Sequence, residues 1–182
     1  MRIISGRWKG RHLIAPTSLP VRPTTDMAKE ALFNILSNEF DLDGIAVTDL
    51  FAGTGNISYE FASRGALSVR AVERDRGCIK YIASTALTLE FPQIEIIPTD
   101  VFRYVGRQQP ASDIVFADPP YDLQPEKYRE LVDAVFANGL LSDSGILVVE
   151  HPKSIDLSDM RYFMQMRHYG TVHFSFFEHN PG

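Results

Sequence analysis

Residues 46–56, Ala-Val-Thr-Asp-Leu-Phe-Ala-Gly-Thr-Gly-Asn, form the stretch that decides the fold. The first half, 46–51, is short and mostly apolar, which predicts a buried strand. Gly53 and Gly55 follow at once, and glycines there let the backbone turn tightly and approach a ligand closely. A helix is expected next, over 57–64. A strand that enters a helix through a glycine turn is typical of α/β sheets, in which ligands bind at the carboxyl ends of the strands.

Strands and helices continue to alternate along the chain. We expect strands over 68–73, 94–98, 113–117 and 145–150, and helices over 76–90 and 125–137. A helix at the start of this series opens at Thr24-Thr25-Asp26, because threonine caps free N–H groups and Asp26 suits the positive helix end. It ends near Asn38. Two last strands, 162–169 and 171–178, are joined at Gly170 as an antiparallel pair. This order predicts a doubly wound α/β sheet.

The composition is that of one globular domain. The chain has 182 residues, of which 45% are hydrophobic and 23% are charged, as in ordinary soluble domains. No apolar run reaches about 18 residues, so a membrane span is not expected. A single cysteine, Cys78, excludes an internal disulfide and a cysteine-based zinc cluster. The five histidines have no paired spacing that indicates a metal, and we expect a cytoplasmic protein.

The charge is distributed unevenly. The chain as a whole carries −5, but no acidic residue precedes Asp26, and the first 24 residues carry five cations. These cations are Arg2, Arg7, Lys9, Arg11 and Arg22. Residues 2–5 and 11–14 are expected to form two short strands around a glycine-bounded turn, followed by an extended connector. A basic hairpin on an acidic body predicts contact with a polyanion at one end of the molecule.

Two acids follow strands where a cofactor would lie. Glu73 ends the second strand and stands 20 residues after Gly53, a spacing at which an acid can accept hydrogen bonds from both ribose hydroxyls of an adenosine-containing cofactor. Asp100 follows the third strand, where it could hold an adenine amino group or cap a helix. Ser58 replaces the third glycine of the dinucleotide fingerprint, which disfavours a nicotinamide dehydrogenase.

The sequence Asp118-Pro119-Pro120-Tyr121 follows an apolar strand. Its two prolines remove two backbone donors and stiffen the turn, so carbonyl groups are free to accept. Asp118 adds a carboxylate and Tyr121 adds a flat face for stacking. A planar ring that carries an exocyclic NH2 can donate hydrogen bonds to these acceptors and stack on the tyrosine ring. If Asp118 and a proline carbonyl accept the two hydrogens of this amine, its nitrogen is oriented toward a methyl sulfonium held on the opposite side.

These residues resemble class I S-adenosylmethionine-dependent N-methyltransferases that act on exocyclic amines. The blocks 2–11 (Arg-Ile-Ile-Ser-Gly-Arg-Trp-Lys-Gly-Arg), 22–26, 30–34 and 51–55 narrow the resemblance to the RsmD family, over nearly the whole chain from Arg2 to Glu178. That family methylates guanine N2 in the small-subunit (16S) ribosomal RNA of bacteria. The resemblance implies a Rossmann-like, seven-stranded sheet, mostly parallel with a C-terminal antiparallel strand. It also implies an N-terminal β-hairpin extension, 1–24, ahead of a methyltransferase domain, 25–182.

The resemblance assigns roles to three groups of residues. The acceptor base is expected at Asp118, Pro119, Pro120 and Tyr121. S-adenosylmethionine is expected at Thr24, Thr25, Asp26, Phe51, Ala52, Gly53, Thr54, Gly55, Asn56, Glu73 and Asp100, with no metal. RNA is expected at Arg2, Arg7, Trp8, Lys9, Arg11 and Arg22. The substrate would be ribosomal RNA within an assembled or partly assembled particle, and the enzyme would act as a monomer.

The chain departs from the family pattern at one position, and other functions stay open. Met27 stands where the family often has an arginine, and we expect Lys29 to supply a substitute basic contact. The same chemistry could act on adenine N6 in nucleic acid or on a glutamine amide in protein. A protein that keeps the fold but only binds RNA is a further alternative.

Overall fold

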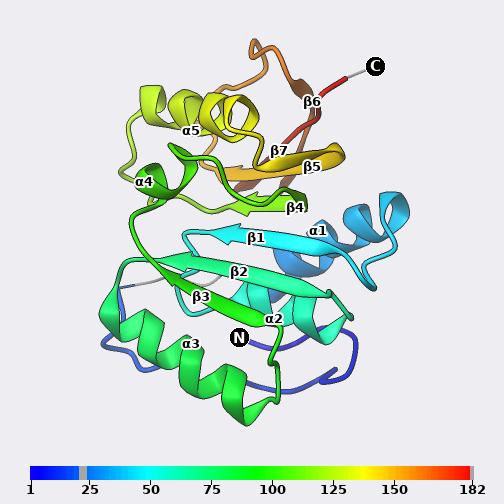
Figure 1. Cartoon of the computed structure of the whole chain (residues 1–182), viewed down its shortest axis with the longest axis vertical. Coiled ribbons are helices and arrows are strands. Elements are labelled where there is room, and N and C mark those ends of the chain that lie inside the picture. The colour runs from blue at the N-terminus through cyan, green and yellow to red at the C-terminus, as the bar shows by residue number, and fades with distance from the viewer. Residues whose placement is uncertain (21–23, 181–182) are drawn as a thin grey trace.

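The computed structural model describes residues 1–20 and 24–180, which are built around one sheet (Figure 1). The sheet has the order β3-β2-β1-β4-β5-β7-β6. Its strands are β1 (Ala46–Leu50), β2 (Ser68–Glu73), β3 (Ile94–Pro98), β4 (Ser112–Ala117), β5 (Leu141–His151), β6 (Phe163–Tyr169) and β7 (Val172–Phe177). The pairs from β3 across to β5 are parallel, and β7 is antiparallel to both β5 and β6. The predicted seven-stranded sheet, mostly parallel with an antiparallel C-terminal strand, is therefore confirmed.

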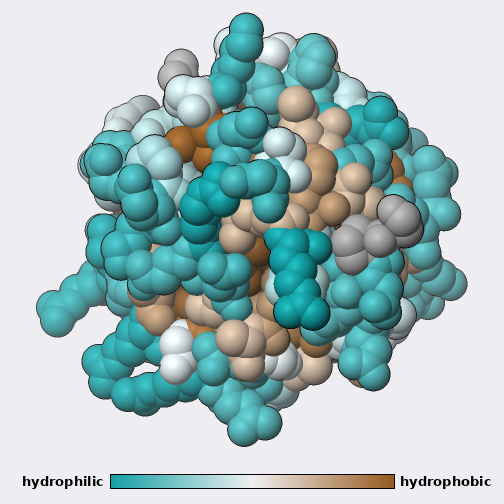
Figure 2. All heavy atoms as spheres, turned by 90° about the horizontal axis from the view of Figure 1, so that it is seen from above, coloured by the Kyte–Doolittle hydropathy of each residue, from teal (hydrophilic) through white to brown (hydrophobic). Residues whose placement is uncertain are grey.

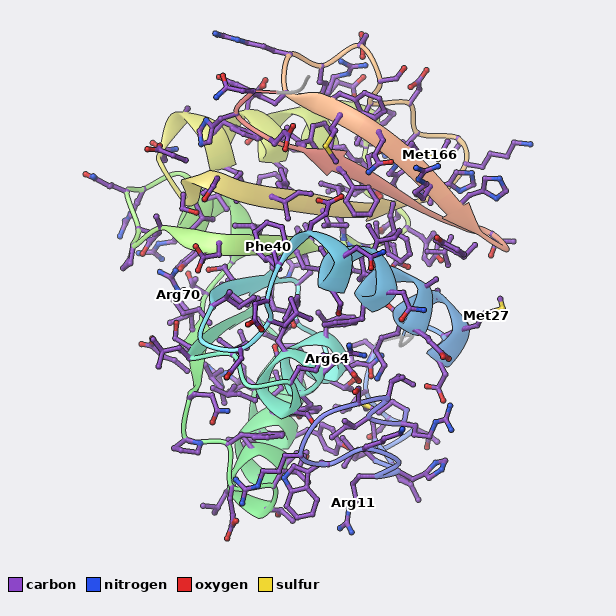
Figure 3. The ribbon with its side chains drawn as sticks, turned by 90° about the vertical axis from the view of Figure 1, so that its right-hand side faces the viewer. Arg11, Met27, Phe40, Arg64, Arg70 and Met166 are labelled. Atoms are coloured by element: carbon purple, nitrogen blue, oxygen red, sulfur yellow. The ribbon has the colours of Figure 1, made fainter. Side chains whose placement is uncertain are left out.

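Five helices of the described residues cover the two faces of the sheet. They are α1 (Asp26–Glu39), α2 (Asn56–Ser63), α3 (Arg76–Thr88), α4 (Val101–Val105) and α5 (Pro125–Ala137). The first three share one apolar core with one face, and α4 and α5 share a second core with the other. Figure 3 shows α1 and α5 on opposite sides of the strands. Val47 enters the first core and Leu50 the second, so β1 is buried on both faces, and its two polar residues, Thr48 and Asp49, are buried with it.

Local signals account for most element boundaries. The Thr25 hydroxyl accepts from Ala28 N at 3.2 Å and caps α1, as the sequence predicts. β5 begins at Leu141, four residues before the predicted start, because Leu141 pairs with Ser112 ahead of an irregularity in the register. Helix α4 was not predicted, since its five residues are too few to show a helical period.

At the β6 end of the sheet the surface is mostly hydrophilic, with apolar side chains gathered near its centre (Figure 2).

Residues 1–14 form an antiparallel pair of segments, which we call the N-terminal ribbon. Ile3 N donates to Arg11 O at 3.0 Å, and Gly10 N donates to Ile3 O at 2.8 Å. A single β-bridge, Arg2 to His12, stands where two short strands were expected. The ribbon lies against α2 and α3 (Figure 1), and Ile3 is buried in the core beneath it. The division into 1–24 and 25–182 stays a prediction, and Arg22 lies outside the described residues.

Candidate active site

The carboxyl ends of β1, β2 and β4 open onto one cleft of about 930 Å³. The chain reverses direction along the sheet between β1 and β4, and this is the point at which ligands bind in such folds. The glycine turn after β1, Glu73 at the end of β2 and Asp118-Pro119-Pro120-Tyr121 after β4 all line this cleft. The topology therefore brings together the glycine turn and the Asp118 loop, although Gly53 and Asp118 stand 65 residues apart in the sequence.

The glycine turn has a backbone shape that requires its glycines. Gly53 and Gly55 have φ values of 56° and 81°, and Phe51 also lies in the left-handed region at 61°. A Cβ at Gly55 would come within 2.7 Å of the Tyr59 ring, so a larger residue does not fit. The turn releases the chain into α2 at Asn56, which also lines the cleft. The first turn of α2 thus begins at the edge of the cleft.

Glu73 is fixed in place by backbone donors. Its Oε2 accepts from Gly53 N at 2.8 Å, and its Oε1 accepts from Arg74 N and Asp75 N, each at 2.8 Å. These bonds tie the end of β2 to the glycine turn after β1. A carboxylate held in one orientation at the rim of the cleft is suited to receive the two hydroxyls of a ribose.

Asp100 adopts the helix-cap role that the sequence left open. Its Oδ1 accepts from Phe102 N at 2.9 Å and Arg103 N at 3.3 Å, and so caps α4. Its Oδ2 lies 3.3 Å from Arg74 Nη1. The residue still lines the cleft, so adenine contact stays a prediction. Sequence reasoning missed Phe102, whose ring meets that of Phe51 edge to face at 6.3 Å on the cleft wall.

The loop Asp118-Pro119-Pro120-Tyr121 presents an acidic side chain to the cleft. Asp118 N donates to Leu50 O at 3.4 Å, but no described side chain bonds the Asp118 carboxylate. Burial raises the pKa of Asp118 well above its usual range, and the charges of Glu150 and Asp49 raise it further. Pro119 and Pro120 follow, and Leu123 N donates to Pro120 O at 2.9 Å to close the turn. Tyr121 is 62% exposed at the mouth of the cleft.

Two further buried acids, Asp49 and Glu150, were missed from sequence. Asp49 Oδ2 accepts from the Ser58 hydroxyl at 2.6 Å, and Glu150 Oε2 accepts from the Thr24 hydroxyl at 3.1 Å. Burial raises the pKa of each carboxyl to about 7. The available signal was position, because an acid inside or at the end of an apolar strand of a parallel sheet is buried.

The start of α1 contributes one residue to the cleft lining. Thr24 lines the cleft, and its carbonyl accepts from Asn56 Nδ2 at 3.2 Å. Thr25 caps the helix, and Asp26 pairs with Arg2 Nε at 3.3 Å. A cofactor role for Thr25 and Asp26 stays a prediction. Gly55 stands at the turn behind the cleft, while Phe51, Ala52, Gly53 and Thr54 line it directly.

The basic residues of the ribbon differ in the contacts that their side chains make. Arg7 pairs with Glu90 at 2.6 Å, and the Trp8 indole N–H donates to Leu89 O at 2.8 Å. Trp8 is half-buried, which gives it a structural role in holding the ribbon down. Lys9 and Arg11 are exposed, and Arg11, whose guanidinium carbon lies 5.9 Å from the centroid of the Trp8 ring, points away from the body of the molecule (Figure 3). These two are best placed to meet a polyanion.

The expectation that Lys29 replaces a lost surface arginine is wrong. Lys29 is fully buried, and its Nζ donates to Arg2 O at 2.5 Å and to Asn56 Oδ1 at 2.9 Å. It also lies 3.3 Å from the Glu60 carboxylate. Met27 is 65% exposed and projects outward (Figure 3). The polar groups that become buried around a lysine are set by tertiary packing, which a single sequence does not show.

The part of the chain that the structure describes contains no candidate metal centre. There, no group of three or more His, Cys, Asp and Glu side chains is arranged to hold a metal ion. Cys78 is fully buried in α3, where desolvation raises the pKa of its thiol to about 12. No described helix is long and apolar enough to cross a membrane.

The chain is similar to known proteins both in sequence and in fold. The model of the family described as "Conserved hypothetical protein 95" matches residues 1–178. Ribosomal RNA small subunit methyltransferase D of Escherichia coli (strain K12) is 32% identical over 150 residues, which cover 82% of this chain and 74% of that protein. The solved structure of yhhF from Escherichia coli has a TM-score of 0.84 and 27% identity, covering 100% and 99% of the two chains. Magnesium protoporphyrin IX methyltransferase from Synechocystis, solved with bound SAM, shares the fold at a TM-score of 0.64 and 16% identity, over 82% of this chain and 76% of that one.

Proposed function

The chain belongs to the conserved hypothetical protein 95 family, the RsmD family that its motifs resemble, and on this basis we propose that it methylates ribosomal RNA. The methyl group comes from S-adenosylmethionine, and the acceptor is the exocyclic N2 amine of a guanine in small-subunit (16S) ribosomal RNA. One observation carries the proposal. The Glu73-anchored glycine turn and the Asp118-Pro119-Pro120-Tyr121 loop line the same cleft, so a methyl donor and a planar amine can meet there.

The residues of the cleft fit the cofactor. A cavity of about 930 Å³ lies at the upper end of the range for ligand pockets, which leaves room for S-adenosylmethionine and a base together. Glu73 is oriented for the ribose, and the rings of Phe51 and Phe102 offer apolar walls for an adenine. The bound cofactor supplies a methyl group on a positively charged sulfur, which a nitrogen lone pair can attack in line.

Asp118 and the Pro119 carbonyl act on the amine. The guanine amine is a poor nucleophile because its lone pair is conjugated with the ring. Two acceptors that bind its hydrogens turn the lone pair toward the methyl group and raise the electron density on nitrogen. As the N–C bond forms and the C–S bond breaks, the nitrogen becomes cationic and gives a proton to Asp118. The raised pKa of Asp118 makes it a strong acceptor for that proton.

RNA binding is proposed at the N-terminal ribbon. The base must leave its stack to enter the cleft, and the exposed face of Tyr121 offers a surface for the base as it enters. Lys9 and Arg11 would pair with phosphates, which fix the register of the RNA rather than read its sequence. Since the ribbon is small, the shape of a ribosomal particle would supply much of the specificity.

The proposal is tested by identifying the product. The protein is incubated with methyl-labelled S-adenosylmethionine and bacterial small subunits that lack this modification, and the digested RNA is resolved into nucleosides by mass spectrometry. We expect label in N2-methylguanosine, and none with Asp118→Ala. Label in N6-methyladenosine or in a ribosomal protein would replace guanine with adenine or a glutamine amide as the acceptor. Binding of the cofactor without any labelled product would contradict the methyl-transfer proposal.

A further inference from the structure

Two carboxyl groups lie next to each other at the carboxyl ends of β4 and β5, that of Asp118 in the lining of the cleft and that of Glu150 behind it. Ala117 of β4 and Val149 of β5 are register partners, so the residues that follow them, Asp118 and Glu150, lie at the same level along neighbouring parallel segments. Glu150 is only 6% exposed. No described lysine or arginine pairs with either carboxylate. Like charges in a partly desolvated site repel each other, and a ligand that brings hydrogen-bond donors would relieve this repulsion.

Glu150 has one oxygen fixed and one available. The Thr24 hydroxyl donates to Oε2 at 3.1 Å, and no described residue donates to Oε1. Thr24 itself lines the cleft, so the Glu150 carboxylate lies immediately behind the cleft wall, next to Asp118. A buried carboxylate with an unpaired oxygen at a binding site is a ready acceptor for a donor on the ligand.

The position of Thr24 is maintained by a buried network. Asn56 Nδ2 donates to Thr24 O at 3.2 Å, and Lys29 Nζ donates to Asn56 Oδ1 at 2.9 Å. Lys29 is held in turn by the Glu60 carboxylate at 3.3 Å, and both of these side chains are fully buried. The Thr24 hydroxyl is therefore preorganised to donate to Glu150. This hydrogen bond favours the charged form of the carboxyl, which accepts but cannot donate, while burial acts in the opposite direction and raises the pKa of Glu150 to about 7.

The edge of guanine matches this pair of acceptors. Guanine carries two adjacent donor groups, the N1–H and the N2 amine, whereas adenine places an N1 lone pair beside its N6 amine. We propose that Glu150 is a specificity-determining residue, whose free oxygen accepts the N1–H of guanine while Asp118 accepts the adjacent N2–H. An ionised Glu150 would repel the N1 lone pair of adenine. The inference rests on the proposed function, because it explains how that site selects guanine.

The test uses a base that keeps the reacting amine and lacks the N1–H. 2-Aminopurine has the same 2-amino group, but its N1 is an acceptor. Small-subunit RNA with guanine or 2-aminopurine at the mapped target nucleotide is assembled into particles, and kcat/KM is measured for each. We expect the wild-type protein to prefer guanine by about 100-fold, the value of one hydrogen bond to a charged group. With Glu150→Gln, whose amide can donate to N1, the preference should fall below about tenfold.

A matched variant controls for the general loss of a negative charge. Glu130 lies on α5, is half-exposed and pairs with Lys127 at 2.6 Å. Glu130→Gln should leave the preference unchanged. If Glu150→Gln fails to fold, Thr24→Val removes the hydroxyl donor and favours the protonated, donating form of Glu150. The preference should then fall at neutral pH and recover at higher pH, and Thr24→Ser should restore it. Other titratable groups near the pair are Asp49 on β1 and Tyr128 on α5.

The outcomes separate the two proposals. A wild-type protein that methylates guanine and a folded Glu150→Gln variant that keeps the full preference would overturn the role of Glu150 and leave the proposed function standing. A wild-type protein that methylates guanine and 2-aminopurine equally would do the same. Transfer to adenine N6 alone would overturn both, because adenine has no N1–H. A reduced preference in Glu150→Gln, with Glu130→Gln unchanged, supports the inference.

Discussion

The backbone N–H of Gly53 donates to the Glu73 carboxylate at 2.8 Å, which joins the turn after β1 to the end of β2. Two more backbone donors, Arg74 N and Asp75 N, complete the contacts of this carboxylate. Glu73 therefore supports the glycine turn, and in the proposed function it has a second role as an acceptor for the cofactor. The two roles can be separated by measurement.

Glu73→Gln should weaken both cofactor binding and the fold. The amide presents one acceptor oxygen where the carboxylate presents two, so a ribose hydroxyl and at least one backbone N–H lose a partner. We expect the Kd for S-adenosylmethionine to rise by about 10- to 100-fold and the free energy of unfolding to fall by about 1–3 kcal/mol. Calorimetric titration and chemical denaturation measure the two effects. A variant with unchanged cofactor affinity would remove Glu73 from the binding site.

Asp118→Ala should abolish transfer without weakening the fold. The carboxylate of Asp118 has no described hydrogen-bond donor, and burial together with Glu150 raises its pKa. Its removal should cut kcat by at least about 100-fold and leave cofactor affinity largely intact. Since an unpaired buried carboxyl is unfavourable, the melting temperature should stay equal or rise. A fall in melting temperature would show that Asp118 stabilises the fold.

Asp49 should make the folded protein less stable as the pH rises. Burial raises the pKa of Asp49 from 3.8 to about 7 in the folded state, with the Ser58 hydrogen bond acting in the opposite direction. Between these values the folded state binds more protons than the unfolded state, so the free energy of unfolding falls as pH increases. Asp49→Asn should remove part of this slope and be more stable than wild type at pH 8, by on the order of 2–4 kcal/mol.

Melting temperatures from pH 4 to pH 8 for both proteins measure this difference. The Glu150 carboxyl, with a pKa also raised to about 7, should preserve the remainder of the slope in Asp49→Asn. Parallel curves for the two proteins would show that Asp49 titrates normally.

Replacement of Lys9 or Arg11, the exposed cations of the ribbon without a described ion pair, should weaken RNA binding in a salt-dependent way. Lys9 and Arg11 are exposed and make no described ion pair, unlike Arg7. We expect Lys9→Ala and Arg11→Ala each to reduce the slope of log affinity against log salt by about one, with cofactor binding unchanged. Arg167→Ala, an exposed cation on β6 at the other end of the sheet, is the control. An effect of equal size in the control would place the RNA elsewhere or over a wider surface.

Local signals in the sequence predicted most of the fold. The strands 68–73 and 94–98 and the helix 125–137 match the structure residue for residue. Their signals are apolar runs and helical periods bounded by turn residues, which act over a few positions. The cleft could also be predicted in outline, since parallel strands bring their carboxyl ends to one edge of the sheet.

Buried charges could not be predicted in the same way. Lys29 and Glu60 lie on helices where charged residues usually face water, yet both are fully buried. Each is buried because its partner comes from a distant segment, and Glu60 accepts from Ile4 N at 2.8 Å and Ser5 N at 3.0 Å. Such contacts depend on the packed ribbon. For the same reason the hydrogen-bond partner of Glu150 could not be predicted, since Thr24 is 126 residues away, although the position of Glu150 in a strand indicated its burial.

The packing of the ribbon can be tested with two glycines that differ in the space available for a Cβ atom. Gly6 and Gly10 both have positive φ, +80° and +82°, so alanine at either position carries backbone strain of about 1–2 kcal/mol. A Cβ at Gly6 would lie 1.8 Å from Ser63 O, whereas a Cβ at Gly10 meets nothing within 4 Å. Gly10→Ala should therefore lose only the strain energy, and Gly6→Ala should also push the ribbon away from α2.

This displacement breaks specific contacts. Arg7 N donates to Ser63 O at 2.7 Å, and the Ser63 hydroxyl donates to Ser5 O at 2.7 Å. Two lost hydrogen bonds cost about 1–3 kcal/mol, so the free energy of unfolding should fall further in Gly6→Ala than in Gly10→Ala by that amount. Chemical denaturation of both variants gives the comparison. Hydrogen exchange at Arg7 N should accelerate in Gly6→Ala alone, because this amide loses its acceptor only when the ribbon moves. Equal losses of stability in the two variants would mean that the ribbon does not dock on α2 in solution.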